Sequence, residues 1–376
     1  MEIAPFKLER YFARYEFNVK YLLCSSDCES RSVGDLLAFE PEAEERFKHL
    51  WLGYTESPGN LSLREEISHI YSGIKPDDIL VHSGAEEAIF LFMHAVLQPC
   101  DHVIVHWPCY QSLFEIARDI GCEVTLWEAR QENKWAPDMD ELKRLLRPNT
   151  KAIVVNTPHN PTGYLMPQDD FRSLNNLVQD RGMILFSDEV YRGLEFNPDE
   201  RLPAACDINP SAVSLGVMSK TYGLAGLRIG WITTHNAKVL MGMAMLKDYT
   251  TICNSAPSEF LSELALRQRI PIAARNLKII QYNLSRLNDF FAKHSDLFEW
   301  VRPKAGPIAF PRLKNEDIEQ FCHQLVTNAG VLLLPGTLYD HPGNHFRIGF
   351  SRVNMPEAIK HLELFLESRA IRGRTQ

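Results

Sequence analysis

A lysine near the middle of the chain lies at a position where its amine could act as a nucleophile. Lys220 lies in SKTYGLAGLRIGW (Ser219 to Trp231), directly after the apolar run Val213 to Val217 and before a glycine-punctuated loop that holds Arg228. A lysine at the end of a buried strand is partly shielded from water. This desolvation lowers the pKa of its amine, and the neutral amine can attack a carbonyl carbon. A lysine after a strand is otherwise most often a surface residue.

Two loops that follow apolar strands could present polar groups at the edge of a sheet. NTPHNPTG (Asn156 to Gly163) follows Ala152 to Val155, and its prolines stiffen a loop that can hold the amide of Asn160 outside the sheet. SGAEEA (Ser83 to Ala88) opens a helix with small residues, which lets backbone N–H groups approach an anion. A turn with an N-cap explains SGAEEA equally well.

A third strand ends in two carboxylates. FSDEVY places Asp188 and Glu189 after the apolar run Met183 to Ser187. A carboxylate at the end of such a strand is costly to bury without a cation, so we expect a cationic partner nearby. Arg192 is the plain candidate for that partner.

Alternating strands and helices must position these segments. That alternation is typical of crossover units and a mostly parallel, buried sheet. We predict helices over residues 61–71, 85–97, 113–120, 139–146 and 168–179. We predict strands over residues 79–81, 102–106, 123–127, 152–155, 183–187 and 213–217.

The pattern changes after residue 270 and predicts a second, smaller α+β domain. The first forty residues have no strong period and are expected to pack against it. The expected elements are a long helix over 271–294, strands over 298–302, 308–311 and 345–350, and a closing helix over 356–368.

Taken together, and in their order along the chain, three of these motifs resemble those of one known family. NPTG, SDEVY and SKTYGLAGLRIG match, almost letter for letter, segments of the class I/II aminotransferases, fold-type I enzymes that use pyridoxal phosphate. Asn160 and Asp188 are 28 residues apart, and Asp188 and Lys220 are 32 apart. The resemblance runs from YTESPGNLSLRE, which begins at Tyr54, to HFRIGFSR, which ends at Arg352.

The resemblance implies a fold and an activity. A large cofactor-binding domain over residues 46–270 would contain a mostly parallel seven-stranded sheet between helices. A smaller α+β domain would cover residues 271–376, with residues 1–45 packed against it. A homodimer with shared active sites is implied as well. The implied reaction moves an amino group from an L-amino acid to a 2-oxo acid in a ping-pong cycle that starts from an internal aldimine on Lys220.

The matching positions have implied roles toward pyridoxal 5′-phosphate. Lys220 would form the Schiff base and shuttle a proton, and Asp188 would keep the pyridine nitrogen protonated. Asn160 and Tyr191 would hydrogen-bond the ring hydroxyl, and the ring of Tyr110, in WPCY, would stack on the cofactor. The remaining positions would receive the phosphate: Ser83, Gly84, Ala85, Ser219, Arg228, and Tyr54 from the partner subunit.

Arginines near the C-terminus are candidates for binding the substrate. Arg347 matches the residue that grips the α-carboxylate, with Asn160 beside it, because a planar guanidinium offers two parallel donors. Arg352 is the competing candidate. No residue can be assigned to the substrate side chain. Three segments are candidates for that role: the stretch before Tyr54, Tyr15 to Ser26, and Tyr339 to His345.

Two features depart from the family pattern. Val217 stands where a serine or threonine commonly helps to bind the phosphate, so phosphate affinity is expected to be lower unless Ser219 and Thr221 compensate. The N-terminal Gly-x-Pro segment that often closes over the substrate is replaced by LLCSSDCESRSVGDLL. The sequence therefore does not identify the residues that close the site.

Two alternative functions stay open. A β-lyase, a decarboxylase or a cyclase would use the same cofactor and the same loss of the Cα proton, and side-chain geometry would decide the outcome. Tyr191 favours transamination, because lyases of this fold often have a histidine there. A non-catalytic regulator of this fold would usually carry a DNA-binding module ahead of it, and only about forty residues precede the matching region.

The composition is that of a folded protein. The 376 residues suggest two domains, and 45% are hydrophobic and 23% charged. A net charge of −8 provides no overall field for nucleic acid, and the apolar stretch Ala88 to Leu97 is too short to span a membrane. The N-terminus lacks the pattern of a signal peptide, so we expect a cytoplasmic protein.

The cysteines favour reduced thiols. Eight are scattered along the chain with no C-x-x-C pair. Cys100, His102, His106 and Cys109 are all possible zinc ligands within ten residues. Because HVIVH has the alternation of a short strand and the cysteine spacing fits no closed zinc motif, we expect no metal.

Overall fold

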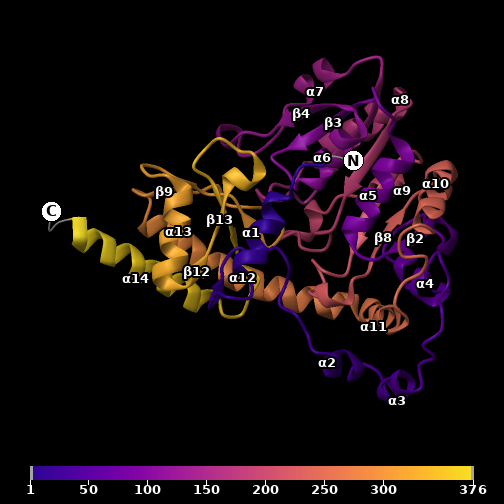
Figure 1. The fold of residues 1–376 in the computed structure, drawn as a ribbon, viewed down its shortest axis with the longest axis horizontal. Helices are drawn as coiled ribbons and strands as arrows, with labels where there is room; N and C mark the ends of the chain where they lie inside the picture. The colour runs from indigo at the N-terminus through magenta and orange to yellow at the C-terminus, as the bar shows by residue number, and fades with distance from the viewer. Residues whose placement is uncertain (1–2, 374–376) are drawn as a thin grey trace.

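A seven-stranded, mostly parallel sheet organises the fold (Figure 1). The computed structural model describes residues 3–373. The strand order is β2-β8-β7-β6-β5-β3-β4, and β8 alone runs antiparallel to its neighbours. The predicted α/β fold class with a mostly parallel sheet of seven strands is therefore confirmed.

The bounds of the elements are as follows. The strands of the large sheet are β2 (Ile79–His82), β3 (His102–Trp107), β4 (Glu123–Glu128), β5 (Thr150–Asn156), β6 (Ile184–Asp188), β7 (Ala212–Val217) and β8 (Gly230–Thr233). The other strands are β1 (Tyr21–Leu22), β9 (Phe298–Glu299), β10 (Ile308–Ala309), β11 (Arg312–Leu313), β12 (Val331–Leu332), β13 (Leu334–Pro335) and β14 (Phe346–Gly349). The α-helices are α1 (Lys7–Tyr15), α2 (Val33–Leu37), α3 (Ala43–Lys48), α4 (Leu61–Ser68), α5 (Ala85–Val96), α6 (Ser112–Ile120), α7 (Met139–Leu145), α8 (Gln168–Asp180), α9 (Ala205–Ile208), α10 (Ala237–Lys247), α11 (Ala256–Arg267), α12 (Arg269–Lys293), α13 (Ile318–Ala329) and α14 (Met355–Gly373).

The helices and strands predicted between residues 61 and 217 are all present, with ends shifted by a few residues. β8 is not predicted, because its residues directly follow a glycine-punctuated loop and are too few to show a period. Gly230 pairs with His82 on one side and with Val217 on the other. A Cβ at Gly230 would lie 2.7 Å from the carbonyl carbon of Gly84, so glycine allows the loop after β2 to approach the end of β7.

The C-terminal third forms a separate group of helices and short strands beside the sheet (Figure 1). β10, β14 and β13 form one antiparallel sheet, and β11 pairs with β9. The strand predicted over 298–302 is only two residues long, and α10, α11, α13, β11, β12 and β13 are additions to the predicted elements. Very short strands carry too little alternation to be recognised from sequence.

The first part of the N-terminal segment, with α1 and β1, lies between the two groups of elements, whereas α2 and α3 lie at the bottom of the view in Figure 1. β1 pairs in parallel with β12, and the indigo helix α1 lies between the C-terminal elements and the sheet in Figure 1. No helix was predicted at α1, because no strong period was recognised in the first forty residues. The division of the chain at residues 45 and 270 stays a prediction. None of the helices within residues 3–373 is long and apolar enough to cross a membrane.

Candidate functional site

Most of the predicted site residues line one cavity of about 510 Å³. The cavity lies where β5, β6 and β7 end, because the carboxyl ends of parallel strands meet at one edge of a sheet. Ser83 and Gly84 directly precede the lining residue Ala85, and Tyr54, whose side chain is 84% exposed, does not line the cavity. The predicted residues that line the cavity are Ala85, Tyr110, Asn160, Asp188, Tyr191, Ser219, Lys220, Arg228 and Arg347.

Lys220 presents a buried amine to this cavity. It follows β7, and its Nζ donates a hydrogen bond to Oγ of Ser26 at 3.0 Å. Burial lowers the pKa of the amine, whereas the nearby carboxylate of Asp27 acts to raise it. The lowered pKa increases the fraction of neutral amine, which is the nucleophilic and basic form.

Asp188 ends β6 and forms no ion pair within residues 3–373, and its nearby cation is Lys220 rather than Arg192. Burial raises the pKa of its carboxyl to about 7, whereas the N–H of Val190, which donates to Oδ1 at 3.2 Å, and the charge of Lys220 act to lower it. Arg192 instead approaches Glu189, with 3.7 Å between Nη1 and Oε2. The carboxylate of Asp188 is thus left available to a cationic group in the cavity.

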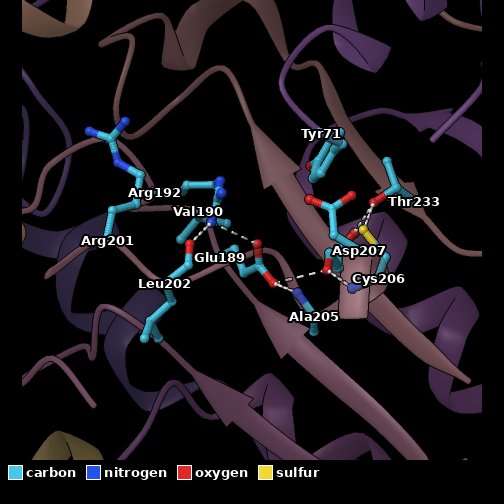
Figure 2. Close-up of polar contacts among 12 residues, drawn as sticks. Tyr71, Glu189, Val190, Arg192, Arg201, Leu202, Ala205, Cys206, Asp207 and Thr233 are labelled. Atoms are coloured by element: carbon cyan, nitrogen blue, oxygen red, sulfur yellow. Dashed lines mark hydrogen bonds and ion pairs between the residues drawn. The ribbon is translucent and has the colours of Figure 1, made fainter. Parts of the chain in front are cut away.

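Glu189 is fixed on the other side of the strand by a separate network (Figure 2). Its Oε1 accepts hydrogen bonds from the backbone N–H of Ala205 and from the hydroxyl of Ser214, both at 2.9 Å. Arg192 in turn donates to the carbonyl oxygen of Leu202 at 2.8 Å. These contacts secure the residue next to Asp188 and hold the end of β6 in place.

Asn160 and Tyr191 project into the same space. Oδ1 of Asn160 accepts from the hydroxyl of Tyr339 at 3.0 Å, and its backbone N–H donates to Oδ1 of Asn156 at 2.6 Å. The hydroxyl of Tyr191 is buried and makes no hydrogen bond of regular geometry among the described residues; burial raises its pKa, and the nearby Arg347 and Ser26 act to lower it. A buried hydroxyl without a partner is costly, so this atom points to a group that is bound in the cavity.

Arg347 enters the cavity from β14. The side chain is 1% exposed; Nε donates to the carbonyl oxygen of Cys24 at 3.0 Å, and Nη1 donates to the hydroxyl of Tyr339 at 2.6 Å. Nη2 is buried and has no hydrogen-bond partner within residues 3–373. The competing candidate, Arg352, forms an ion pair with Asp27 at 2.7 Å. The open guanidinium in the cavity is therefore that of Arg347.

The N-terminus of α5 and Arg228 form a cradle for an anion. The glycine before the helix, Gly84, has φ 88°, and a Cβ there would lie 2.5 Å from Nη2 of Arg228. No side chain caps the first turn of α5, so its backbone N–H groups are open to an anion. These groups also carry the partial positive charge of the helix N-terminus. Val217 lines the cavity near this cradle and offers no hydroxyl.

Several lining residues were not identified from the sequence. Helix α1 contributes Glu9, Phe12 and Glu16, and the loop after β1 contributes Ser26 and Asp27. Of these, Glu16, which directly follows α1, and Ser26 lie in a segment considered for substrate contact, Tyr15 to Ser26. The others had no recognisable signal, because only the tertiary structure brings α1 to the ends of β5, β6 and β7.

The cysteine and histidine residues near β3 make other contacts. The two ring nitrogens of His102 bond the hydroxyls of Thr150 and Thr125, each at 2.8 Å. The ring of His106 stacks on that of His159 with centroids 4.0 Å apart. Within residues 3–373 no group of three or more His, Cys, Asp or Glu side chains is arranged to hold a metal ion.

Comparisons with known proteins agree with this geometry. The sequence profile of the family "Aminotransferase class I and II" matches residues 20–362. Capreomycidine synthase of Streptomyces vinaceus is 28% identical over 350 residues, which are 92% of this chain and 88% of that protein.

Two solved structures superpose on nearly the whole chain. A PLP-dependent aminotransferase from Streptococcus suis has a TM-score of 0.92 and 31% identity, and the match covers 98% of this chain and 99% of that one. A PLP-dependent cyclase, OrfR, has a TM-score of 0.90 and 28% identity, with 98% of each chain covered. The chain therefore belongs to the class I and II aminotransferase family, and its cofactor is pyridoxal 5′-phosphate.

Proposed function

We propose that the protein is an aminotransferase that moves an amino group from an L-amino acid to a 2-oxo acid in a ping-pong cycle. The proposal rests on the arrangement of three side chains in one cavity. A buried amine, Lys220, and a buried carboxylate, Asp188, line the same cavity as the open guanidinium of Arg347. The cavity thus offers a base, an acid and a carboxylate receptor to one small molecule.

The residues present fit pyridoxal 5′-phosphate. Arg228, Ser219 and the N-terminus of α5 form the anion cradle that its phosphate requires. The unpartnered hydroxyl of Tyr191 and the amide of Asn160 would bind the ring hydroxyl. The ring of Tyr110 lines the cavity and would cover one face of the cofactor. Ser83 and Gly84, just before α5, stay part of the proposed phosphate site.

When bound, pyridoxal 5′-phosphate supplies a conjugated ring that withdraws electrons from the substrate Cα. Asp188 would hold a proton at the pyridine nitrogen, because a cation beside a buried carboxylate reverses the effect of burial on its pKa. Lys220 would remove and return the Cα proton through Nζ. Arg347 would bind the α-carboxylate through its free Nη2 and so orient Cα toward Lys220.

A second candidate is a cyclase. It rests on two comparisons, with capreomycidine synthase and with the cyclase OrfR, each 28% identical to this chain. A β-lyase or a decarboxylase would share the same first proton transfer. In each case Lys220, Asp188 and Arg347 would keep the roles given above, and the outcome would depend on the substrate side chain.

We also propose a homodimer in which Tyr54 reaches the phosphate of the partner subunit. Trp51, Leu52 and Tyr54 are 77%, 76% and 84% exposed. Three large apolar or aromatic side chains together on one loop favour contact with another surface. The cytoplasm is the proposed compartment, because all eight cysteines are free thiols.

A panel of amino donors tests the proposal. The purified holoenzyme is mixed with single amino acids without a 2-oxo acid, and conversion of the cofactor to its amine form is followed by absorbance. Transamination predicts stoichiometric conversion and a released 2-oxo acid. Elimination would release pyruvate and ammonia with the cofactor unchanged, and cyclisation would give a product of altered mass without a 2-oxo acid. Either result would replace aminotransfer with the second candidate.

A further inference from the structure

The charges that line the cavity are unequal. Five acidic side chains line it, namely Glu9, Glu16, Asp27, Glu86 and Asp188. Three basic side chains line it, namely Lys220, Arg228 and Arg347. The cavity must also accept the phosphate of the cofactor and the carboxylate of a substrate. Additional acidic side chains do not help to bind these two anionic groups. The acidic residues therefore call for separate explanations.

Three of the five acids have an evident role. Asp27 forms an ion pair with Arg352. Burial raises the pKa of Glu86 to about 7, and the hydroxyl of Ser112 donates to its Oε2 at 3.1 Å, so it need not carry a full charge. Asp188 is the proposed partner of the pyridine nitrogen. Glu9 and Glu16 remain.

Glu9 and Glu16 have no ion-pair partner within residues 3–373. The carboxylate of Glu9 accepts a hydrogen bond from the hydroxyl of Tyr110 at 2.8 Å. Burial raises the pKa of Glu16, the nearby negative charges of Asp27 and Glu9 add to this shift, and the more weakly acting positive charges of Arg352 and Lys220 oppose it. These like charges repel one another, and a cation placed between them would relieve the repulsion.

Both carboxylates lie on the side of α1 that faces the open arginine. Positions 9, 12 and 16 follow one another at helical spacing, so they share one face of α1 and its C-terminal end. The guanidinium carbon of Arg347 lies 5.8 Å from the centre of the Phe12 ring. Its unpartnered Nη2 and the unpartnered hydroxyl of Tyr191 open into the same cavity, so a ligand is expected between α1 and the sheet.

We propose that this face of α1, with Glu9, Phe12 and Glu16, binds the substrate side chain and selects an L-amino acid whose side chain ends in an ammonium or guanidinium group. The inference rests on the proposed function, which places the α-carboxylate at Arg347. Phe12 and Leu22 provide an apolar wall for the methylene groups. Glu9 and Glu16 bind the terminal cation, and they repel the carboxylate of an acidic amino acid.

The test compares ligands of equal shape and different charge. The holoenzyme is titrated with L-arginine and its neutral isostere L-citrulline, with L-lysine and L-norleucine, and with L-glutamate. The readout is the amplitude of the rapid change in the cofactor's visible absorption that precedes conversion to the amine form, because its dependence on amino-acid concentration gives the Kd separately from turnover. We expect each cation to bind at least about ten-fold more tightly than its neutral counterpart, and glutamate to bind more weakly than either. The arginine and lysine arms distinguish a guanidinium from an ammonium site.

Variants then test the assignment to α1. The preference is the ratio of the Kd of the neutral isostere to the Kd of the cationic amino acid. Glu9→Gln and Glu16→Gln should each reduce this preference, and the double variant should bring the ratio close to one. Glu357→Gln, which alters an exposed carboxylate in the first turn of α14, is the matched control and should keep the full preference. The comparison of isosteres in the unmodified protein needs no variant to fold.

The outcomes separate this inference from the proposed function. If citrulline, norleucine or glutamate binds as tightly as the cations, the inference is wrong and the aminotransferase proposal stands. An unchanged preference in the double variant would also overturn it. If no amino acid alters the cofactor's absorption, the proposed function itself fails.

Discussion

Nη1 of Arg347 donates a hydrogen bond to the hydroxyl of Tyr339 at 2.6 Å, and this contact fixes the guanidinium while Nη2 stays without a partner. Tyr339 also donates to Asn160 at 3.0 Å. The three side chains therefore form one buried, oriented group at the edge of the cavity. A substrate carboxylate would meet donors whose positions are already set, so little entropy is lost on binding.

Replacing Arg347 with lysine should weaken binding of the α-carboxylate. Lysine cannot supply the fork of donors and would lose the bonds to Tyr339 and Cys24. We expect a loss of about 2 kcal/mol, which is roughly thirty-fold in KM for the amino acid. Steady-state kinetics measures it. Arg352→Lys is the control: it should change KM by less than about two-fold, because Arg352 pairs with Asp27. Equal KM increases in both variants would contradict the assignment.

Lys220→Ala should abolish turnover, because its amine is the proposed base and covalent attachment point. We expect the rate to fall by at least about 10⁴-fold, together with loss of the cofactor's characteristic visible band. Absorption spectroscopy and single-turnover kinetics measure the two effects. Lys238→Ala, at an exposed position of α10, should leave both unchanged. A Lys220→Ala protein with the normal band and rate would remove this lysine from the mechanism.

Without cofactor, Asp188 should make the stability depend on pH. Its folded-state pKa is about 7, whereas an unfolded aspartate ionises near 4. Native protein thus holds a proton that unfolding releases between these values, so this contribution to stability is present below about pH 4 and is lost as the pH rises to about 7. Denaturant unfolding of the apoprotein at several pH values measures it.

The asparagine in Asp188→Asn cannot ionise. The stability of this variant should therefore lack the pH-dependent contribution of Asp188. Relative to wild type, the unfolding free energy of the variant should therefore rise between pH 4 and 7, by up to about 4 kcal/mol. With cofactor bound, the same variant should lose most of its rate, because the pyridine nitrogen would no longer be kept protonated. Asp180→Asn, exposed at the end of α8, is the control for both measurements. A parallel pH dependence in the two variants would contradict the predicted pKa.

Tyr54→Phe should weaken cofactor binding if the residue reaches the phosphate of the partner subunit. Loss of a hydrogen bond to a charged phosphate should raise the Kd for pyridoxal 5′-phosphate by about ten-fold. Equilibrium titration measures the Kd, and light scattering measures the mass of the assembly. Tyr249→Phe, at a tyrosine that is 92% exposed, is the control. A monomeric protein with unchanged affinity would refute the shared site.

Val217→Thr should strengthen the phosphate site. The new hydroxyl would point toward the cradle formed by Arg228 and α5, and we expect the Kd for the cofactor to fall by a few-fold. The apoprotein should lose about 1 kcal/mol of stability, because the hydroxyl is buried without a partner. Val213→Thr, in the core on the same strand, should cost stability without changing the Kd. A Kd that stays the same in both variants would show that Ser219 already satisfies the phosphate.

The sequence by itself determined the sheet strands that bear polar side chains, and with them Lys220, Asp188 and Asn160. Their positions follow from local pattern, since an apolar run ends and a polar residue begins, and parallel strands bring such ends together. It did not predict the antiparallel strand β8 or the two-residue strands β11, β12 and β13, although it did predict a strand at β14, which bears Arg347. Such short strands show little alternation, and their pairing is fixed by partners far along the chain.

Only the tertiary structure decided which side chains complete the cavity. Helix α1 is separated from Lys220 by about two hundred residues, and nothing local indicates that Glu9 and Glu16 line the same cavity as the amine. The structure distinguishes Arg347 from Arg352 in the same way, because only packing shows that Asp27 forms an ion pair with the second arginine. Charge pairing depends on distances between residues remote in sequence, and these distances exist only once the chain has folded.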